Sequence, residues 1–154
     1  MVSYSNTPSD KLEKFLISKF QELTTFKPKH AIQNSSELIH KLSFINLDNS
    51  IKLVSFDVKS MYPNIPPDEC YPLTKEILIK DNVNPYIISE FCSLLKTCLS
   101  LNFFQFESKF YKQTSGLPMG SPLSPLMSNI FMNNLEENIL QDPLSKKHIR
   151  GERQ

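Results

Sequence analysis

A short apolar run that ends in one acid and two prolines constrains the fold of this chain more than any other stretch. Residues 51–58 are rich in β-branched and large apolar side chains, which predicts a largely buried strand. Pro63 and Pro66 stop that strand, because proline cannot donate a backbone hydrogen bond to a sheet. Asp57 is therefore expected near the carboxyl end of a strand, where open α/β sheets place their chemistry. An aspartate that only caps a turn is the alternative interpretation.

A second stretch, residues 116–125, combines two glycines, three prolines and two serines in a rigid loop. Ser121 is the expected N-cap of a following helix, and Pro122 its first residue. That helix is predicted to reach about Leu140, where Asp142-Pro143 stops it. Its apolar face consists of Leu123, Leu126, Met127, Ile130, Phe131 and Leu135. A loop of this kind either offers backbone N–H groups to a phosphate or simply starts a structural helix.

Capping signals and apolar periodicity predict the remaining helices. They are expected at 7–24, from Asn34 onward, at about 71–80, and after Asn84-Pro85. The third is expected to be short, because Pro72 would cost about 3 kcal/mol inside a longer helix. The apolar face of the fourth consists of Ile87, Ile88, Phe91, Leu94, Leu95 and Cys98, with Cys92 off its centre.

Residues 103–106 and 110–113 are predicted to form a β-hairpin joined through residues 107–109. Its aromatic stripe, Phe103, Phe104 and Phe106, is expected to belong to the core rather than to a platform for stacked bases. The predicted fold class is therefore α+β, with helices backing a small antiparallel sheet.

Composition limits the class of protein. The net charge of +1 weakens a nucleic-acid role without excluding it, since a local basic face is sufficient. The basic tail, residues 145–154, is expected to be solvated. Three cysteines without CxxC spacing, Cys70, Cys92 and Cys98, predict reduced and buried thiols. No apolar run approaches the ~18 residues of a membrane span, so an intracellular protein, nuclear or cytoplasmic, is expected.

The two organising stretches together resemble a known family. Residues 57–66, Asp-Val-Lys-Ser-Met-Tyr-Pro-Asn-Ile-Pro, resemble motif A of reverse transcriptases. Residues 103–125 are similar to the hairpin and motif B that follow it, and residues 2–16 to the segment that Penelope-like retroelement proteins carry after their fingers. The resemblance covers about residues 2–144. It implies a right-hand polymerase palm that performs RNA-directed DNA synthesis with Mg²⁺, an RNA or DNA primer-template and deoxynucleoside triphosphates.

The resemblance also implies roles for individual residues. Asp57 is the expected catalytic aspartate that bridges two divalent metals, and the backbone carbonyl of Val58 a further metal ligand. Tyr62 is expected under the incoming sugar, where its bulk excludes a 2′-hydroxyl; a core tyrosine is the alternative. The residues expected against the nucleotide and template base are Met119, Gly120, Ser121 and Pro122, with Gln113 and Gly116 beside them.

The chain departs from the family pattern in its carboxylates. The remaining metal aspartates of the family form an adjacent pair in a Tyr-x-Asp-Asp hairpin, and no Asp-Asp pair occurs in this sequence. The fingers segment that precedes the match in relatives also has no counterpart. The resemblance thus predicts that residues 1–154 form one partial domain, inactive by itself, with weak or absent metal binding.

Two other functions stay open. A domesticated or decayed palm would bind nucleic acid or a protein partner. A family B DNA polymerase has a similar motif A, but its Lys-x-x-x-Asn-x-x-Tyr-Gly helix is replaced here by residues 116–125.

Overall fold

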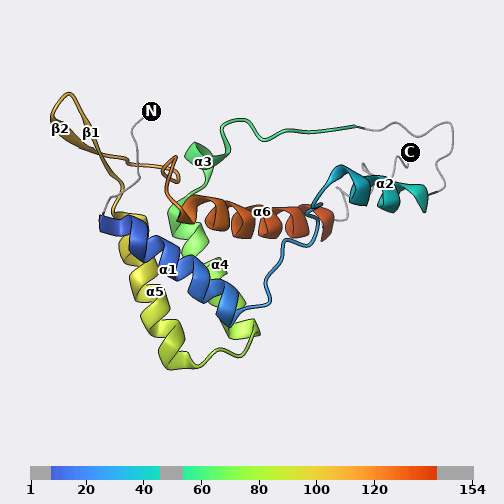
Figure 1. The fold of residues 1–154 in the computed structure, drawn as a ribbon, viewed down its shortest axis with the longest axis horizontal. Coiled ribbons are helices and arrows are strands. Elements are labelled where there is room, and N and C mark those ends of the chain that lie inside the picture. Colours follow the sequence, from blue (N-terminus) through green and yellow to red (C-terminus); the bar gives the residue numbers. More distant parts are fainter. Residues whose placement is uncertain (1–7, 46–53, 142–154) are drawn as a thin grey trace.

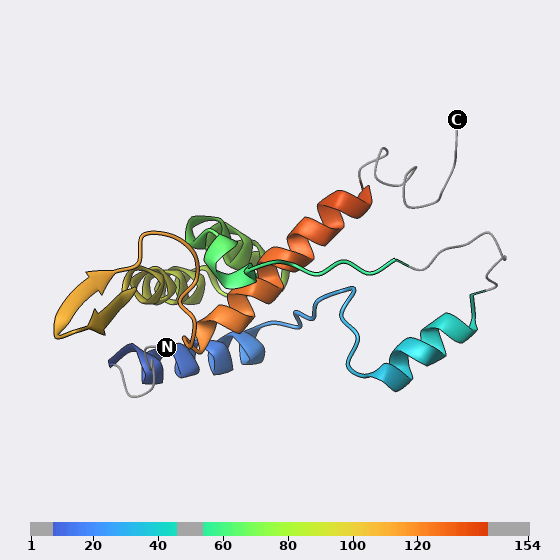
Figure 2. The same cartoon turned by 90° about the horizontal axis from the view of Figure 1, so that it is seen from above.

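The computed structural model of the chain describes residues 8–45 and 54–141. Four helices build its core: α1 (Pro8–Leu23), α4 (Pro67–Lys80), α5 (Pro85–Ser100) and α6 (Leu123–Gln141). Helices α1 and α4 each pack against both α5 and α6 (Figures 1 and 2). The largest core side chains include Leu16, Phe20, Leu78, Leu95, Met127 and Ile130. No helix in the described ranges has the length and apolar character needed to cross a membrane.

The other elements lie outside this bundle. Helix α2 (Ser35–Ser43) has no buried residue and lies at the opposite end of the molecule from the hairpin of β1 (Phe103–Phe106) and β2 (Lys109–Lys112) (Figures 1 and 2). The short helix α3 (Met61–Asn64) contacts α6.

Helix starts follow the local signals. The Asn34 side chain accepts a hydrogen bond from the Glu37 N–H at 2.9 Å, and the Glu37 carboxylate accepts from the Gln33 N–H at 2.8 Å, one residue before the N–H that a capping box uses. The Asn84 side chain accepts from the Tyr86 N–H at 2.9 Å, so the predicted start of α5 is confirmed. Helix α1 is also confirmed, although its predicted cap Thr7, like Asp142-Pro143 and the tail 145–154, lies outside the described residues.

The prediction that Pro72 confines α4 to residues 71–80 is wrong, because α4 is continuous from Pro67. Pro72 lies near the start of the helix on its exposed side, so its missing N–H removes a single backbone hydrogen bond. Burial of Cys70 and Leu78 on the opposite face offsets that loss, at about 1.5–3 kcal/mol for a large apolar side chain.

The predicted apolar face of α5 is shifted in the structure. Cys92 is buried, whereas Ile87 and Leu94 are exposed. The reason is that α5 contacts α1 on one side and α4 on the other, which moves the buried arc toward Cys92. Similarly, Leu135 of α6 is exposed, because the second half of α6 extends beyond most of the bundle (Figure 2).

The prediction of a strand at 51–58 is also wrong for residues 54–58, the part of it that the structure describes. Residues 54–58 have no regular structure, and Val54 and Phe56 are 69% and 94% exposed. A strand needs a partner to complete its hydrogen bonds, and in the described ranges β1 and β2 pair only with each other. The segment instead runs as a strap toward α3, apart from the bundle (Figure 1). Residues 51–53 lie outside the described part.

The hairpin itself is confirmed, with a shorter turn than predicted. Strand β2 begins at Lys109, and the two-residue turn Glu107-Ser108 has φ of +47° and +61°. Two positive φ values match the primed turns whose twist suits a hairpin. The prediction that Phe103, Phe104 and Phe106 belong to the core is wrong, because the ribbon projects from the bundle and all three are exposed (Figures 1 and 2). The fold class is thus mixed, helices with one small antiparallel sheet.

Candidate functional site

A compact turn follows the Asp57 strap. Ser60 adopts a left-handed conformation, φ 52° and ψ 52°, and leads the chain into α3. The Asn64 side-chain amide donates to the carbonyls of Ser60 at 3.0 Å and Lys59 at 3.3 Å, which closes the turn. Asp57 and Val58 precede this turn and are exposed to solvent.

The turn is joined to the glycine-rich loop through backbone atoms. The Leu117 N–H donates to the Tyr62 carbonyl at 2.8 Å. Gly116 has φ +74°, and a Cβ atom added there would lie 2.4 Å from the Pro63 carbonyl oxygen, so only glycine fits this approach. Ile65 and Leu117 are buried and anchor the two segments. The structure thus brings Tyr62, itself half-buried, together with the start of the loop, as predicted.

The rest of the loop folds tightly over the beginning of α6. The N–H of Ser121 donates to the Pro118 carbonyl at 3.3 Å, and the Ser124 hydroxyl donates to the same oxygen at 2.7 Å. Met119 and Gly120, between them, are exposed, and Gly120 has φ +97°. These two residues are the part of the loop that is most accessible to a ligand.

Gln113 connects the hairpin to this loop. Its backbone N–H donates to the Asn102 carbonyl at 2.7 Å, and its side chain donates to the Ser115 carbonyl at 2.7 Å. Gln113 therefore fixes the chain that leads into Gly116.

A buried acid, Glu13 of α1, holds the far end of the loop. The Ser121 hydroxyl donates to Glu13 Oε2 at 2.5 Å, and the Leu123 N–H points to both Ser121 Oγ at 3.2 Å and Glu13 Oε2 at 3.4 Å. Ser121 therefore caps α6 as predicted, although the helix begins at Leu123 rather than at the half-buried Pro122. Its hydroxyl is directed inward, to Glu13.

Our sequence reasoning missed Glu13, although a signal exists. Glu13 lies three residues before Leu16 and seven before Phe20, on the apolar face of α1. A charged residue on that face is buried only when it has polar partners, and at 1% exposure Glu13 is fully buried. The pattern predicts such a partner without saying which residue supplies it.

The described residues do not complete a site for two divalent metals. Within 8–45 and 54–141, no three Asp, Glu, His or Cys side chains gather closely enough to hold an ion. Hard cations such as Mg²⁺ need several oxygen ligands, and Asp57 with the Val58 carbonyl supplies only part of that set.

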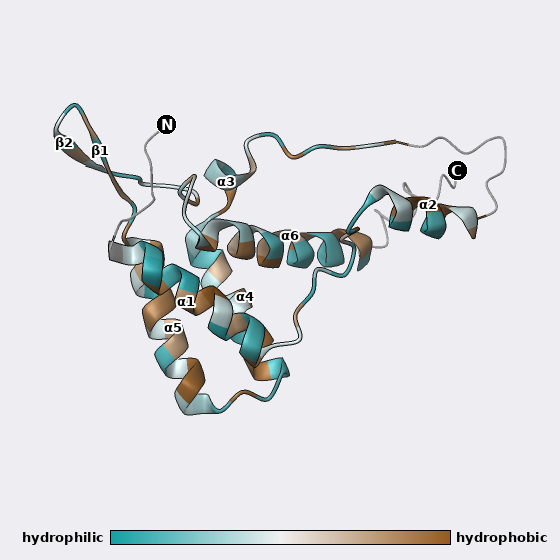
Figure 3. Cartoon of the chain, in the orientation of Figure 1, coloured by the Kyte–Doolittle hydropathy of each residue, from teal (hydrophilic) through white to brown (hydrophobic). Residues whose placement is uncertain are grey.

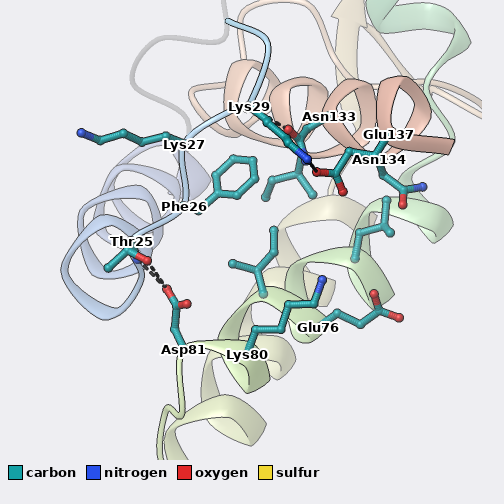
Figure 4. A pocket seen from close by; sticks show the side chains of 13 residues that line it. Thr25, Phe26, Lys27, Lys29, Glu76, Lys80, Asp81, Asn133, Asn134 and Glu137 are labelled. Atoms are coloured by element: carbon teal, nitrogen blue, oxygen red, sulfur yellow. Dashed lines mark hydrogen bonds and ion pairs between the residues drawn. The ribbon is translucent and has the colours of Figure 1, made fainter. Parts of the chain in front are cut away.

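A cavity of about 350 Å³ lies between the segment after α1, α4 and the second half of α6 (Figure 4). Three of its charged residues, Lys29, Asp81 and Glu137, hold that segment in place. Lys29 pairs with Glu137 at 3.5 Å, and Asp81 accepts hydrogen bonds from the N–H of Thr25 at 2.5 Å and from its hydroxyl at 3.2 Å. Because its α6 lining begins at Ile130, it lies about 10 Å or more along that helix from Leu123. The cavity is thus a structural junction apart from the loop.

The three cysteines are free and buried, which confirms the prediction of reduced thiols. Burial raises the pKa of the Cys70 thiol to about 12, with a smaller effect from Glu69. Burial, with Glu13 nearby, raises the pKa of Cys98 to about 11, and burial also raises the pKa of Cys92. The thiols therefore stay protonated near neutral pH and are poor nucleophiles.

Comparison with models of known protein families identifies a match. The family model described as reverse transcriptase (RNA-dependent DNA polymerase) matches residues 1–150. Members of that family bind a template-primer and deoxynucleoside triphosphates and generally use a divalent metal. No curated protein and no solved structure matches the chain.

Proposed function

The chain belongs to the reverse transcriptase family, and from that premise we propose that residues 54–66 and 113–122 form the nucleotide-facing part of a polymerase palm. In this proposal Asp57 is the metal-binding catalytic aspartate, with the Val58 carbonyl beside it. The similarity of residues 2–16 to Penelope-like proteins supports that type of element as the source. The reaction is RNA-directed DNA synthesis, in which a primer 3′-hydroxyl attacks the α-phosphorus of a deoxynucleoside triphosphate, the bond to the β-phosphate breaks and pyrophosphate leaves; Mg²⁺ is the family's expected metal.

The hydrogen bond between Leu117 and Tyr62 is the observation that carries the proposal. It fixes the turn after Asp57 against the loop, so two segments that are far apart in sequence meet at one place. Tyr62 is half-buried and packs against the hydrophobic core, and we propose that its exposed part shares one surface region with the exposed residues Met119 and Gly120. A ring held at this place by packing would exclude a 2′-hydroxyl by its bulk, as the family resemblance suggests for Tyr62.

The inward direction of the Ser121 hydroxyl refines the roles within the loop. Because that hydroxyl donates to Glu13, we assign Ser121 and Pro122 to positioning the loop rather than to direct contact with the nucleotide. Direct contact falls to Met119 and to the backbone of Gly120. Gln113 and Gly116 support the loop from its other end.

The 154 residues by themselves are proposed not to extend a primer. Two-metal catalysis requires ligands that clamp both the attacking and the leaving oxygens. Asp57 contributes one carboxylate, and the sequence contains no Asp-Asp pair to contribute more. Metal and electrostatic terms carry most of the catalysis of phosphoryl transfer, so nucleotide binding is the property to measure in this chain.

The test measures binding of a fluorescent deoxynucleotide to the chain with a primer-template and Mg²⁺. We expect weak binding that Asp57→Ala abolishes and a preference for deoxyribose over ribose that Tyr62→Ala removes. Glu90→Ala, which changes an exposed acid of α5, is the matched control and should leave binding unchanged. Binding that is indifferent to Asp57 and Tyr62 would refute the assignment.

A primer-extension assay accompanies the binding test. No product is expected with Mg²⁺ or Mn²⁺. Extension that disappears in Asp57→Ala would refute the proposed inactivity and would mean that other residues complete the carboxylate set.

A further inference from the structure

The hairpin of β1 and β2 exposes five aromatic side chains that have no role in the site described above. They are Phe103, Phe104, Phe106, Phe110 and Tyr111, with exposed fractions from 38% to 77%. The ribbon projects from the bundle, and its hydrophobic residues stand outside the helical core (Figures 1 and 3). A cluster of apolar side chains exposed on a projecting element indicates an interaction surface.

The strand register divides these side chains between two faces. Paired residues of an antiparallel ladder share a face, and neighbours along a strand alternate. One face therefore carries Phe104, Phe106, Lys109 and Tyr111, and the other carries Phe103, Gln105, Phe110 and Lys112. Side-chain contacts agree with this division: the rings of Phe104 and Tyr111 stack with centroids 5.5 Å apart, and Lys112 Nζ lies 5.7 Å from the ring centroid of Phe103.

This two-sided pattern differs from that of a hairpin that packs onto a protein core. A core-facing hairpin has one apolar and one polar face, because only one side is buried. Here each face carries at least two rings and one lysine. Covering one face with a folded partner would leave the other face exposed, whereas a flexible chain is able to contact both.

The charges of the hairpin indicate which kind of flexible chain would bind it. Lys109 and Lys112 place one cation on each face, and Glu107 at the turn is the one acid between residues 103 and 112. Aromatic rings next to cations match a polyanion that carries planar groups. Proteins bind single-stranded nucleic acid in this way, with bases stacked on rings and basic side chains along the phosphates.

We propose that the hairpin is a stacking surface for an unpaired nucleic-acid strand, namely the single-stranded part of a template. This inference rests on the proposed function, because Gln113 ties the base of the hairpin to the loop that we place against the nucleotide. Three residues, 113–115, separate β2 from Gly116. A template strand on the hairpin is therefore next to the place where its base would be read.

The experiment measures binding of a labelled, unstructured RNA of about 16 nucleotides to the full chain by fluorescence anisotropy. We expect Phe104→Ala and Phe110→Ala, one on each face, to weaken binding about fivefold or more each. Phe15→Ala removes an exposed ring of α1 and is the matched control, which should leave affinity unchanged. Phe104→Leu keeps the residue apolar while removing the ring, so it should also weaken binding if the fold is intact.

The salt dependence of RNA affinity and a comparison of single-stranded with duplex RNA provide two independent tests. Lys112→Gln should reduce the slope of log affinity against log salt by about one, whereas Lys11→Gln on α1 should not. A duplex of the same length should bind more weakly than the single strand, because its bases are not available for stacking.

Three results would overturn the inference. The first is RNA binding that does not change in the hairpin variants, and the second is binding of the duplex as tight as that of the single strand. The third is a hairpin that binds anionic vesicles or a second copy of the chain but does not bind RNA. Asp57→Ala separates the two proposals. Hairpin-dependent RNA binding together with nucleotide binding indifferent to Asp57 refutes the proposed function alone, and the reverse pattern refutes this inference alone.

Discussion

Removing the Ser121 hydroxyl is expected to destabilise the bundle more than removing a comparable hydroxyl on α6. The Ser121 hydroxyl donates to the Glu13 carboxylate at 2.5 Å, and Glu13 is 1% exposed. Water therefore has little access to replace the lost donor in Ser121→Ala. The Leu123 N–H, at 3.4 Å from the same oxygen, is a weaker substitute.

The expected loss in the free energy of unfolding follows from the kind of hydrogen bond that is removed. A hydrogen bond to a charged group contributes about 1.5–3 kcal/mol net, against about 0.5–1.5 kcal/mol for a neutral pair. We expect Ser121→Ala to lower the free energy of unfolding by about 2–3 kcal/mol, which corresponds to roughly 4–12 °C in Tm for a chain of this size. Ser128→Ala, whose buried hydroxyl donates to the neutral Pro125 carbonyl, should cost about 0.5–1.5 kcal/mol.

A double-mutant cycle measured by urea unfolding isolates the pair. Glu13→Leu alone leaves the Ser121 hydroxyl without its acceptor, so the double variant Glu13→Leu/Ser121→Ala should be more stable than the sum of the single changes predicts, by about 1–3 kcal/mol. The matched cycle of Glu13→Leu with Ser128→Ala should be additive. Additivity of Glu13 with Ser121 to within about 0.5 kcal/mol would refute the reasoning.

Three further predictions concern the loop, α4 and the thiols. Gly116→Ala should cost at least about 1–2 kcal/mol in denaturant unfolding, because φ is +74° and the new Cβ would strike Pro63; an unchanged midpoint would contradict this. Pro72→Ala should raise Tm, since alanine restores a backbone hydrogen bond in α4, and a lower Tm would show that the ring contributes packing. Stability should fall as pH rises from about 8.5 toward 11, because the unfolded chain releases thiol protons that Cys70 and Cys98 retain when folded. Unfolding midpoints across that range should fall less steeply in Cys70→Ala/Cys98→Ala, and an equal slope would count against the raised pKa values.

Local signals were sufficient to predict most helices and the hairpin. Asn34 and Asn84 bond to N–H groups only two or three residues away, so their sequence contexts contain the whole interaction. The turn at Glu107-Ser108 is equally local. Motif resemblance added the expectation that Tyr62 lies near the glycine-rich loop, which the bond from Leu117 confirms.

Features that depend on distant partners were not predictable in the same way. The apolar run before Asp57 favours a strand, but strand formation also requires a neighbour, and residues 54–58 have none in the described ranges. Aromatic residues are usually buried, which favours a core position for the stripe at Phe103, yet no element within residues 8–45 and 54–141 covers the ribbon. Glu13 and Ser121 are 108 residues apart, so no local pattern links them.

The packing of α1 onto α5 and α6 has a consequence during synthesis. Leu16 and Phe20 leave the ribosome long before the last of their partners, since the start of α6 at Leu123 lies 100 positions after the end of α1 at Leu23. Helix α5 emerges first and covers part of α1, and at ribosomal rates of about 5–20 residues per second α1 waits about 5–20 s for α6 to complete the packing. Chaperones that bind short apolar segments therefore have a defined interval in which to act on the nascent chain, and that interval ends when α6 emerges and Ser121 reaches Glu13.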